Sequence, residues 1–262
     1  MASAGGAILV IGGVTPGGTT AAILRLDPTA GSVARIGRLA SPVHDASGAP
    51  LGQGWLVLGG GQTLASAVVQ DVSLSGASAS VSVTGALPAA RADGAAVSVG
   101  NEVLVVGGGR GGVPDPTVLA TLDGASFAVL TRLRVAVRYP AVDVSEGRVY
   151  LFGGATTAGS SNAIQAIDAA TGSVQVVARL PYALTQATAF TLGGRILIAG
   201  GMRGGQPSAA ILAFDPATGR TSVVGRLPEA VADAGVAVVG DTAYLIGGET
   251  GSAFLDSVIA VR

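Results

Sequence analysis

The stretch Leu104-Val105-Val106-Gly107-Gly108 is an apolar run that ends in a glycine pair, and close copies of it recur along the chain. The other copies are Ile8-Leu9-Val10-Ile11-Gly12-Gly13, Leu56-Val57-Leu58-Gly59-Gly60, Tyr150-Leu151-Phe152-Gly153-Gly154, Ile196-Leu197-Ile198-Ala199-Gly200-Gly201 and Tyr244-Leu245-Ile246-Gly247-Gly248. The first glycines of successive pairs are 47, 48, 46, 47 and 47 residues apart. So regular a period is the sequence signature of a repeat architecture.

Two further signals recur between the glycine pairs. An Asp-led turn follows most pairs after about 13 to 15 residues, as in Asp27-Pro28-Thr29-Ala30-Gly31, Asp168-Ala169-Ala170-Thr171-Gly172 and Asp215-Pro216-Ala217-Thr218-Gly219, with Asp123-Gly124 as a shortened copy. Asp, Pro and Gly each favour a turn for a separate backbone reason. A Val-rich run and then Leu or Leu-Pro come next, at Leu39, Leu87-Pro88, Leu133, Leu180-Pro181 and Leu227-Pro228.

Each unit is therefore predicted to form four short strands, which we call A (innermost, for example 95–99), B (before the glycine pair), C (for example 210–214) and D (for example 221–224). The B strands are apolar at consecutive positions, which indicates that both of their faces are buried. Sheets stacked between two neighbours meet this requirement. We predict one all-β domain over residues 1–262, a six-bladed β-propeller of four-stranded antiparallel blades at about 1–38, 39–86, 87–132, 133–179, 180–226 and 227–262.

Four strands at this period with a glycine pair after strand B resemble the Kelch repeat of the galactose oxidase-like β-propellers. The resemblance covers the whole chain. One feature departs from it, because the tryptophan that Kelch repeats carry in strand D is missing from every unit, and the single Trp55 begins a B strand. We therefore expect aliphatic side chains to pack the blades.

The two ends of the chain predict an incomplete last blade. Alignment of the glycine pairs places residues 1–4 on strand A of blade 1 and residues 256–262 on strand C of blade 6. No strand D follows, so blade 6 is expected to have three strands, and no strand from the other end crosses the seam. An exposed strand edge invites pairing with another chain, so edge pairing at blade 6 is expected.

Composition limits the functions that the chain can have. The 15 basic residues are all Arg, and 16 acidic residues bring the net charge to −1. This balance gives no general attraction to nucleic acid, and the absence of a long apolar run argues against membrane insertion. The lack of cysteine excludes disulfides and thiolate chemistry. With a single histidine, an imidazole metal site is excluded, and we expect no metal and no cofactor.

The connections between strands predict where a binding site lies. In an antiparallel meander the D–A and B–C connections share one face, and the regular Asp-led turns lie on the other. The sixth residue after each Leu of the Leu-Pro signature varies and enters the innermost strand, so these residues should surround the mouth of the central channel. The candidates there are Asp45, Asp93, Tyr139, Gln186 and Asp233, with His44, Arg138 and Arg91 beside them; the B–C connections add Arg110, Asp115, Arg203 and Glu249.

A structural interpretation of the same residues stays open. An aspartate at the start of strand A can bind neighbouring backbone N–H groups, and the similarity of Asp45, Asp93 and Asp233 across blades favours that role. Arg138 and Tyr139 differ from the other blades, which favours binding. The segment 107–112 resembles a phosphate cradle but lacks the Lys-Ser/Thr of a P-loop and a following helix.

No catalytic set is apparent, and Kelch-type copper oxidases use His, Tyr and Cys groups that this chain cannot supply. We therefore predict a non-catalytic binding module for a protein, peptide or glycan. The alternatives are a carbohydrate-active enzyme similar to the bacterial Kelch-type sialic acid mutarotases, with Arg138 and an aspartate as acid and base, and a purely structural or engineered propeller. The Lys-free, Ala- and Arg-rich composition resembles high-GC bacterial proteins, and bacterial Kelch proteins are often exported, which favours a secreted or periplasmic location.

Overall fold

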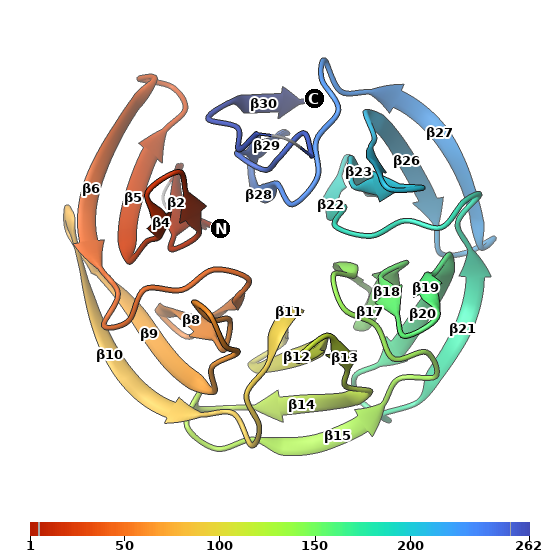
Figure 1. The fold of residues 1–262 in the computed structure, drawn as a ribbon, viewed down its shortest axis with the longest axis horizontal. Coiled ribbons are helices and arrows are strands. Elements are labelled where there is room, and N and C mark those ends of the chain that lie inside the picture. The colour runs from red at the N-terminus through yellow and green to blue at the C-terminus, as the bar shows by residue number, and fades with distance from the viewer. Residues whose placement is uncertain (5, 252) are drawn as a thin grey trace.

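A computed structural model describes residues 1–4, 6–251 and 253–262, and within them the chain forms strands and no helix. Six antiparallel sheets stand in a ring around a central axis, as Figure 1 shows. The chain visits the sheets in sequence order, so each sheet is one blade. The structure confirms the six-bladed β-propeller that the period of the glycine pairs predicts.

Strands A and B of each blade form the inner half of the sheet. The A strands are β1 (Ala2–Ala4), β7 (Ser47–Leu51), β11 (Ala92–Val99), β16 (Ala141–Ser145), β22 (Thr188–Leu192) and β28 (Gly235–Val239). The B strands are β2 (Ala7–Ile11), β8 (Gly54–Leu58), β12 (Glu102–Arg110), β17 (Arg148–Phe152), β23 (Arg195–Ala199) and β29 (Thr242–Ile246). Five of these B strands end directly before their glycine pair. The sixth, β12, continues through its own pair, Gly107-Gly108.

Strands C and D form the outer half. The C strands are β5 (Ala22–Asp27), β9 (Val68–Ser75), β14 (Thr117–Thr121), β20 (Ala163–Asp168), β26 (Ala210–Asp215) and β30 (Val258–Val261), and the D strands are β6 (Ser32–Arg38), β10 (Ser78–Ala86), β15 (Ala128–Arg132), β21 (Val174–Arg179) and β27 (Arg220–Arg226). Each of the five C–D pairs has one register shift, at a corresponding place near the end of the D strand. Such a bulge increases the local twist of the sheet.

Short ribbons that the sequence did not predict occupy several B–C connections. They are β3 (Val14–Thr15) with β4 (Gly18–Thr19), β13 (Val113–Pro114) with β12, β18 (Ala155–Thr156) with β19 (Gly159–Ser160), and β24 (Met202–Arg203) with β25 (Gln206–Pro207). In these blades the B–C connection is therefore a short antiparallel hairpin and not an irregular loop.

The core lies between the blades. Six clusters of buried apolar side chains each join two neighbouring sheets, as Leu104 and Val118 of blade 3 join Val149 and Leu151 of blade 4. The Leu of each Leu-Pro signature is buried in such a junction, with exposed fractions of 2% to 6% at Leu39, Leu87, Leu133, Leu180 and Leu227. Aliphatic groups dominate, as expected, and one group of aromatic side chains, Tyr150, Phe152 and Phe214, packs with ring centroids 5.4 to 6.5 Å apart.

The Asp-led turns form as predicted. The Asp27 carboxylate accepts bonds of 2.9 Å from the N–H groups of Thr29 and Ala30, and Asp215 accepts one of 2.9 Å from Ala217. The hydrogen bond that the Thr218 hydroxyl donates to Asp215, together with the one from the Ala217 N–H, lowers the pKa of Asp215. The turns therefore have a structural role at the C–D end of the ring.

The last blade is incomplete, also as predicted. The sheet order of blade 6 is β28-β29-β30, whereas blade 1 has all four strands, β1-β2-β5-β6. Figure 1 shows β30 beside the opening between the last blade and β5 and β6. Blades 6 and 1 meet through the smallest of the clusters, in which Ile8, Leu26 and Ala237 are buried.

Candidate functional site

Five corresponding residues at the D–A connections form what we call the axial ring. They are Asp45, Asp93, Tyr139, Gln186 and Asp233, and they share a left-handed backbone with φ between 52° and 62°. The N–H of each residue from Asp93 onward donates to the carbonyl of the preceding member, over 2.6 to 3.1 Å. A left-handed backbone is uncommon in residues other than glycine. The ring of bonds between blades explains why it is kept here, since each residue joins two connections.

The structure also brings the B–C connections next to this ring. Isolated bridges pair His44 with Gly61, Arg138 with Ala155, Thr185 with Met202 and Ala232 with Glu249. Each bridge joins a D–A connection to a B–C connection, so the two kinds of connection lie on one face of the propeller.

The carboxylate of Asp93 is paired with Arg138. The Nε and Nη2 atoms of Arg138 lie 2.7 and 2.5 Å from the same Asp93 oxygen. Asp93 is buried, and Arg138 also donates to the Tyr139 hydroxyl over 3.2 Å and lies 4.9 Å from the centre of that ring. Burial raises the pKa of Tyr139 far above its usual range, so the phenol stays neutral. Arg138 is thus a held cation whose charge Asp93 offsets.

Asp45 and His44 form the next part of the site. His44 Nε2 lies 3.6 Å from the Asp45 carboxylate, and His44 Nδ1 lies 2.8 Å from the Thr19 hydroxyl. Burial raises the pKa of Asp45, and the nearby charge of Asp93 adds to the effect. Two carboxylates that disfavour each other's ionisation must be close together.

Asp233 has a weaker partner than Asp93. Its carboxylate accepts a hydrogen bond from the side-chain amide of Gln186. Desolvation by the surrounding atoms raises the pKa of Asp233 to about 7, and the charges of Asp45, Glu249 and Asp93 add to this rise. The hydrogen bond from Gln186 opposes it, and the residue itself is exposed. This carboxyl therefore changes protonation near neutral pH.

A cavity of about 190 Å³ opens onto this cluster. His44, Asp45, Asp93, Arg138 and Tyr139 line it together with Ala92, the B–C segment 61–65 and the glycines Gly109, Gly111 and Gly112. We call it the axial cavity. Among its lining residues Asp93 offsets the charge of Arg138, which leaves Asp45, beside His44, as the further carboxyl group. Asp233 does not line the cavity, but it is close enough to Asp45 and Asp93 for their charges to raise its pKa.

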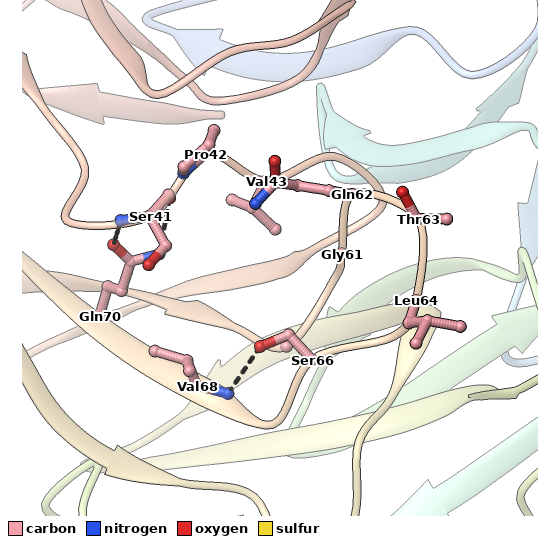
Figure 2. Close-up of a pocket in the computed structure, with 11 residues that line it drawn as sticks. Ser41, Pro42, Val43, Gly61, Gln62, Thr63, Leu64, Ser66, Val68 and Gln70 are labelled. Atoms are coloured by element: carbon pink, nitrogen blue, oxygen red, sulfur yellow. Dashed lines mark hydrogen bonds between the residues drawn. The ribbon is translucent and has the colours of Figure 1, made fainter.

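A second hollow of about 420 Å³ lies on the other side of segment 61–64. Figure 2 shows Gln62, Thr63 and Leu64 curving past Ser41, Pro42 and Val43, with Gln70 bonded to the backbone of Ser41. Leu64 is 83% exposed. Sequence reasoning missed segment 62–64; the extra glycine and the exposed Leu after Gly59-Gly60 were the available signal.

Two predicted site residues bind each other away from the axial cavity. Arg91 is buried, and its guanidinium donates to the carbonyls of Gly107 and Thr117, to the Thr117 hydroxyl and to Asp115, 2.7 Å away. Burial lowers the pKa of Arg91. Partial burial of Asp115 opposes its ionisation, but hydrogen bonds from Thr117 and the charge of Arg91 still lower its pKa. Arg91 and Asp115 therefore hold blades together and are left out of the proposal below.

The remaining candidates lie around the rim. Arg110 is exposed at the end of β12 and pairs through its backbone with Val113. The guanidinium of Arg203 lies 4.1 Å from the centre of the Tyr182 ring. Glu249 bridges Ala232 and Phe254 through its backbone. Of these three, Glu249 contributes to the electrostatics of the axial ring.

One further acidic residue was not predicted. Asp143 lies on the innermost strand β16, and its carboxylate accepts a 2.7 Å bond from the Thr191 hydroxyl of β22. Burial raises its pKa. No sequence signal separated Asp143 from the apolar residues around it, because its position matters only once the inner strands are side by side.

Among the residues that the structure describes, no three His, Cys, Asp or Glu side chains are grouped so as to hold a metal ion. The same residues include no helix long and apolar enough to cross a membrane. The cluster at the axial ring is therefore an assembly of hydrogen-bonding and charged groups. In comparisons with known proteins, no family model matches the chain and no curated protein is similar to it.

Proposed function

We propose that the protein is a Kelch-type binding module that holds a polar ligand in the axial cavity. The observation that supports this proposal most is the axial ring itself. One backbone position, repeated in five connections, carries Asp, Asp, Tyr, Gln and Asp, so the scaffold is constant while the side chains differ. Binding residues are often carried by loops on a rigid scaffold in this way.

The charge around the axial cavity favours a ligand with hydrogen-bond donors and positive charge. Among the described residues, His44 is the only cationic partner near Asp45, and none of the ion pairs involves Asp233 or Glu249. Carboxylates accept hydrogen bonds and attract cations. An ammonium group beside hydroxyl or amide groups, as in a peptide amine or an amino sugar, meets these requirements better than an anionic ligand does.

A thermal-shift experiment tests this function. Glucosamine and a lysine-containing tripeptide are the cationic probes, with glucose and sialic acid as the neutral and anionic comparisons. A ligand that binds the folded state raises the Tm as its concentration rises. We expect the cationic probes to do so and the anionic probe to have little effect.

Two variants locate the binding. Asp45→Asn, at a residue that lines the cavity, should abolish or strongly reduce the shift, whereas Asp241→Asn, which removes the same charge from an exposed turn after β28, should leave it unchanged. A shift that is the same in both variants, or that only sialic acid produces, would argue against a cation site in the axial cavity. Silence with every probe would favour a structural propeller.

A specific observation favours one alternative function. A carboxyl with a pKa of about 7, as Asp233 has, suits general acid–base catalysis. Such a group could assist ring opening of a sugar, as in an enzyme similar to a sialic acid mutarotase. Proton NMR of freshly dissolved sialic acid or glucose would show faster exchange between anomers with the protein than with Asp233→Asn; equal rates would exclude this activity.

A further inference from the structure

The strand β30 leaves one edge of blade 6 open. The N–H of Gly247 donates to the carbonyl of Ser257 over 3.0 Å, so Ser257 faces β29. Because backbone groups alternate in direction along a strand, Val258 and Ala260 direct their N–H and C=O groups to the opposite side. In the other five blades a D strand lies on that side, but within the described residues nothing pairs with it in blade 6.

The five complete junctions use one pattern of hydrogen bonds after the D strand. The N–H of the signature Leu donates to strand C or the residue before it, over 2.7 to 2.8 Å: Leu39 to Ala21, Leu87 to Ala67, Leu133 to Pro116, Leu180 to Asn162 and Leu227 to Ala209. The carbonyl four residues later accepts from the second glycine of the pair, over 2.8 to 2.9 Å: Val43 from Gly13, Arg91 from Gly60, Val137 from Gly108, Leu184 from Gly154 and Val231 from Gly201. The pattern is therefore the repeated way in which a D–A connection docks on a blade.

Blade 6 presents the same groups without that connection. The corresponding acceptor is the carbonyl of Asp256 and the corresponding donor is the N–H of Gly248, and neither has a hydrogen-bond partner among the described residues. Space is open there as well. A Cβ placed on Gly12 would lie 2.6 Å from Val43 O, whereas on Gly247 it would meet only Leu255 O, 3.5 Å away.

The apolar surface at the seam is also incomplete. In blades 2 to 5 the side chain before the glycine pair is deeply buried, as Leu58 and Phe152 are at 1% exposure, whereas Ile11 of blade 1 is half-buried. At the seam the corresponding Ile246, and Tyr244 two residues before it, remain half-buried. Each complete junction contains a buried signature Leu, and the seam has none among the described residues.

We propose that this seam binds an extended segment of a partner polypeptide that has the D-strand signature. The segment would pair as an antiparallel strand with Val258 and Ala260, place a Leu against Tyr244 and Ile246, and offer a carbonyl four residues later to Gly248. In strand addition of this kind, main-chain bonds supply affinity and a side-chain pocket supplies specificity. The surface is separate from the axial cavity, so this inference does not depend on the proposed function.

A fluorescein-labelled peptide of residues 220–232, which contains the blade 5 signature Leu227-Pro228, serves as the probe in a fluorescence-anisotropy titration of the full chain. We expect saturable binding and a rise in Tm. Leu227→Asp in the peptide should weaken binding at least about tenfold, because the apolar contact is lost. In the protein, Ala260→Pro should weaken it by a similar factor, since proline removes an edge donor yet is tolerated in edge strands.

Val33→Pro is the matched control in the protein. It introduces the same residue into the outer strand β6 of blade 1, a complete blade whose outer edge is not part of the seam. It should leave the affinity unchanged. Absence of binding, or equal binding to Ala260→Pro, would overturn the proposal, as would equal affinity of the Leu227→Asp peptide. A dimer in light scattering that disappears in Ala260→Pro would assign the edge to a second copy and would also overturn it. Folding of Ala260→Pro is checked by its circular dichroism and Tm.

Discussion

The carboxylate of Asp93 is held by Arg138, whereas Asp233, at the corresponding place three blades later, has only the amide of Gln186. The backbone of both residues has the same left-handed conformation and the same kind of bond to the preceding connection. At the residue scale, the structural and the functional interpretations of these aspartates therefore both hold. The backbone of each residue joins neighbouring blades, whereas the side chain at this position varies from blade to blade.

The buried guanidinium of Arg91 gives a prediction about stability. Arg91→Ala would leave two backbone carbonyls, the Thr117 hydroxyl and Asp115 without their donor. Breaking a buried ion pair by removing one partner costs about 3 kcal/mol or more. Urea unfolding should show this loss, whereas Arg110→Ala, at an exposed site, should change stability by less than about 0.5 kcal/mol. Equal effects in the two variants would contradict the structural role of Arg91.

The raised pKa of Asp233 gives a prediction about pH. Its pKa rises from 3.8 to about 7 on folding, so the folded state binds the proton more tightly than the unfolded state does. The stabilisation is complete below the unfolded pKa and is lost as pH rises through the folded pKa. We therefore expect Asp233→Asn to gain Tm relative to wild type between pH 5 and pH 8. A difference in Tm that does not change with pH would contradict this.

At the scale of the strand and its turn, the glycine pairs decide how blades join. Gly107 has a φ of +63°, and a Cβ there would lie 2.9 Å from the Val137 carbonyl of the next connection. Only glycine combines this backbone with so close an approach. The sequence predicted the six B strands from the apolar run before each pair and its regular period, whereas the close approach to the next connection became visible only in the structure.

Gly100 provides the control for this argument. Its φ of +62° matches that of Gly107, but a Cβ there would meet no atom within 4 Å. Gly100→Ala should lower the free energy of unfolding by about 1 kcal/mol, because alanine disfavours the left-handed backbone conformation. Gly107→Ala should cost at least about 2 kcal/mol more, because the added methyl group meets backbone that must shift. Equal losses in chemical denaturation would show that the close approach does not matter.

Other elements were beyond sequence reasoning. The ribbons β18–β19 and β24–β25 lie in short Gly-containing segments that carry no alternation of apolar and polar residues. Arg91 was expected at the axis because of its distance from Asp93, but its side chain turns into the junction toward Asp115. The direction of a side chain depends on the neighbouring blade, which lies about 47 residues away in the sequence.

At the scale of the whole molecule, stability should vary around the ring. Repeat units contact their neighbours, so their stability depends on the interfaces on both sides. Among the residues whose burial the structure describes, which leave out the side chains of β1, the cluster between blades 6 and 1 has three buried members and the cluster between blades 5 and 6 has ten. The period predicted the missing D strand of blade 6, and the smaller cluster at the seam accompanies it.

Hydrogen exchange checks this asymmetry. Amides of β29 and β30 should exchange faster than those of β23 and β26 at the corresponding positions of blade 5, because the seam opens more easily than a complete junction. Mass spectrometry of peptides from both blades in one sample provides the comparison. Equal protection in blades 5 and 6 would mean that the seam is as stable as the other junctions.

The main functional argument is that connections from different blades assemble an acidic cluster around the axis. Carbon-13 NMR of the Asp233 carboxyl measures that assembly directly, since an isolated aspartate would titrate near 3.8 and the crowded one near 7. We predict a midpoint of about 7 that falls in Asp45→Asn, because the charge of Asp45 raises the pKa of Asp233. A midpoint near 3.8, unchanged by Asp45→Asn, would show that the cluster does not form.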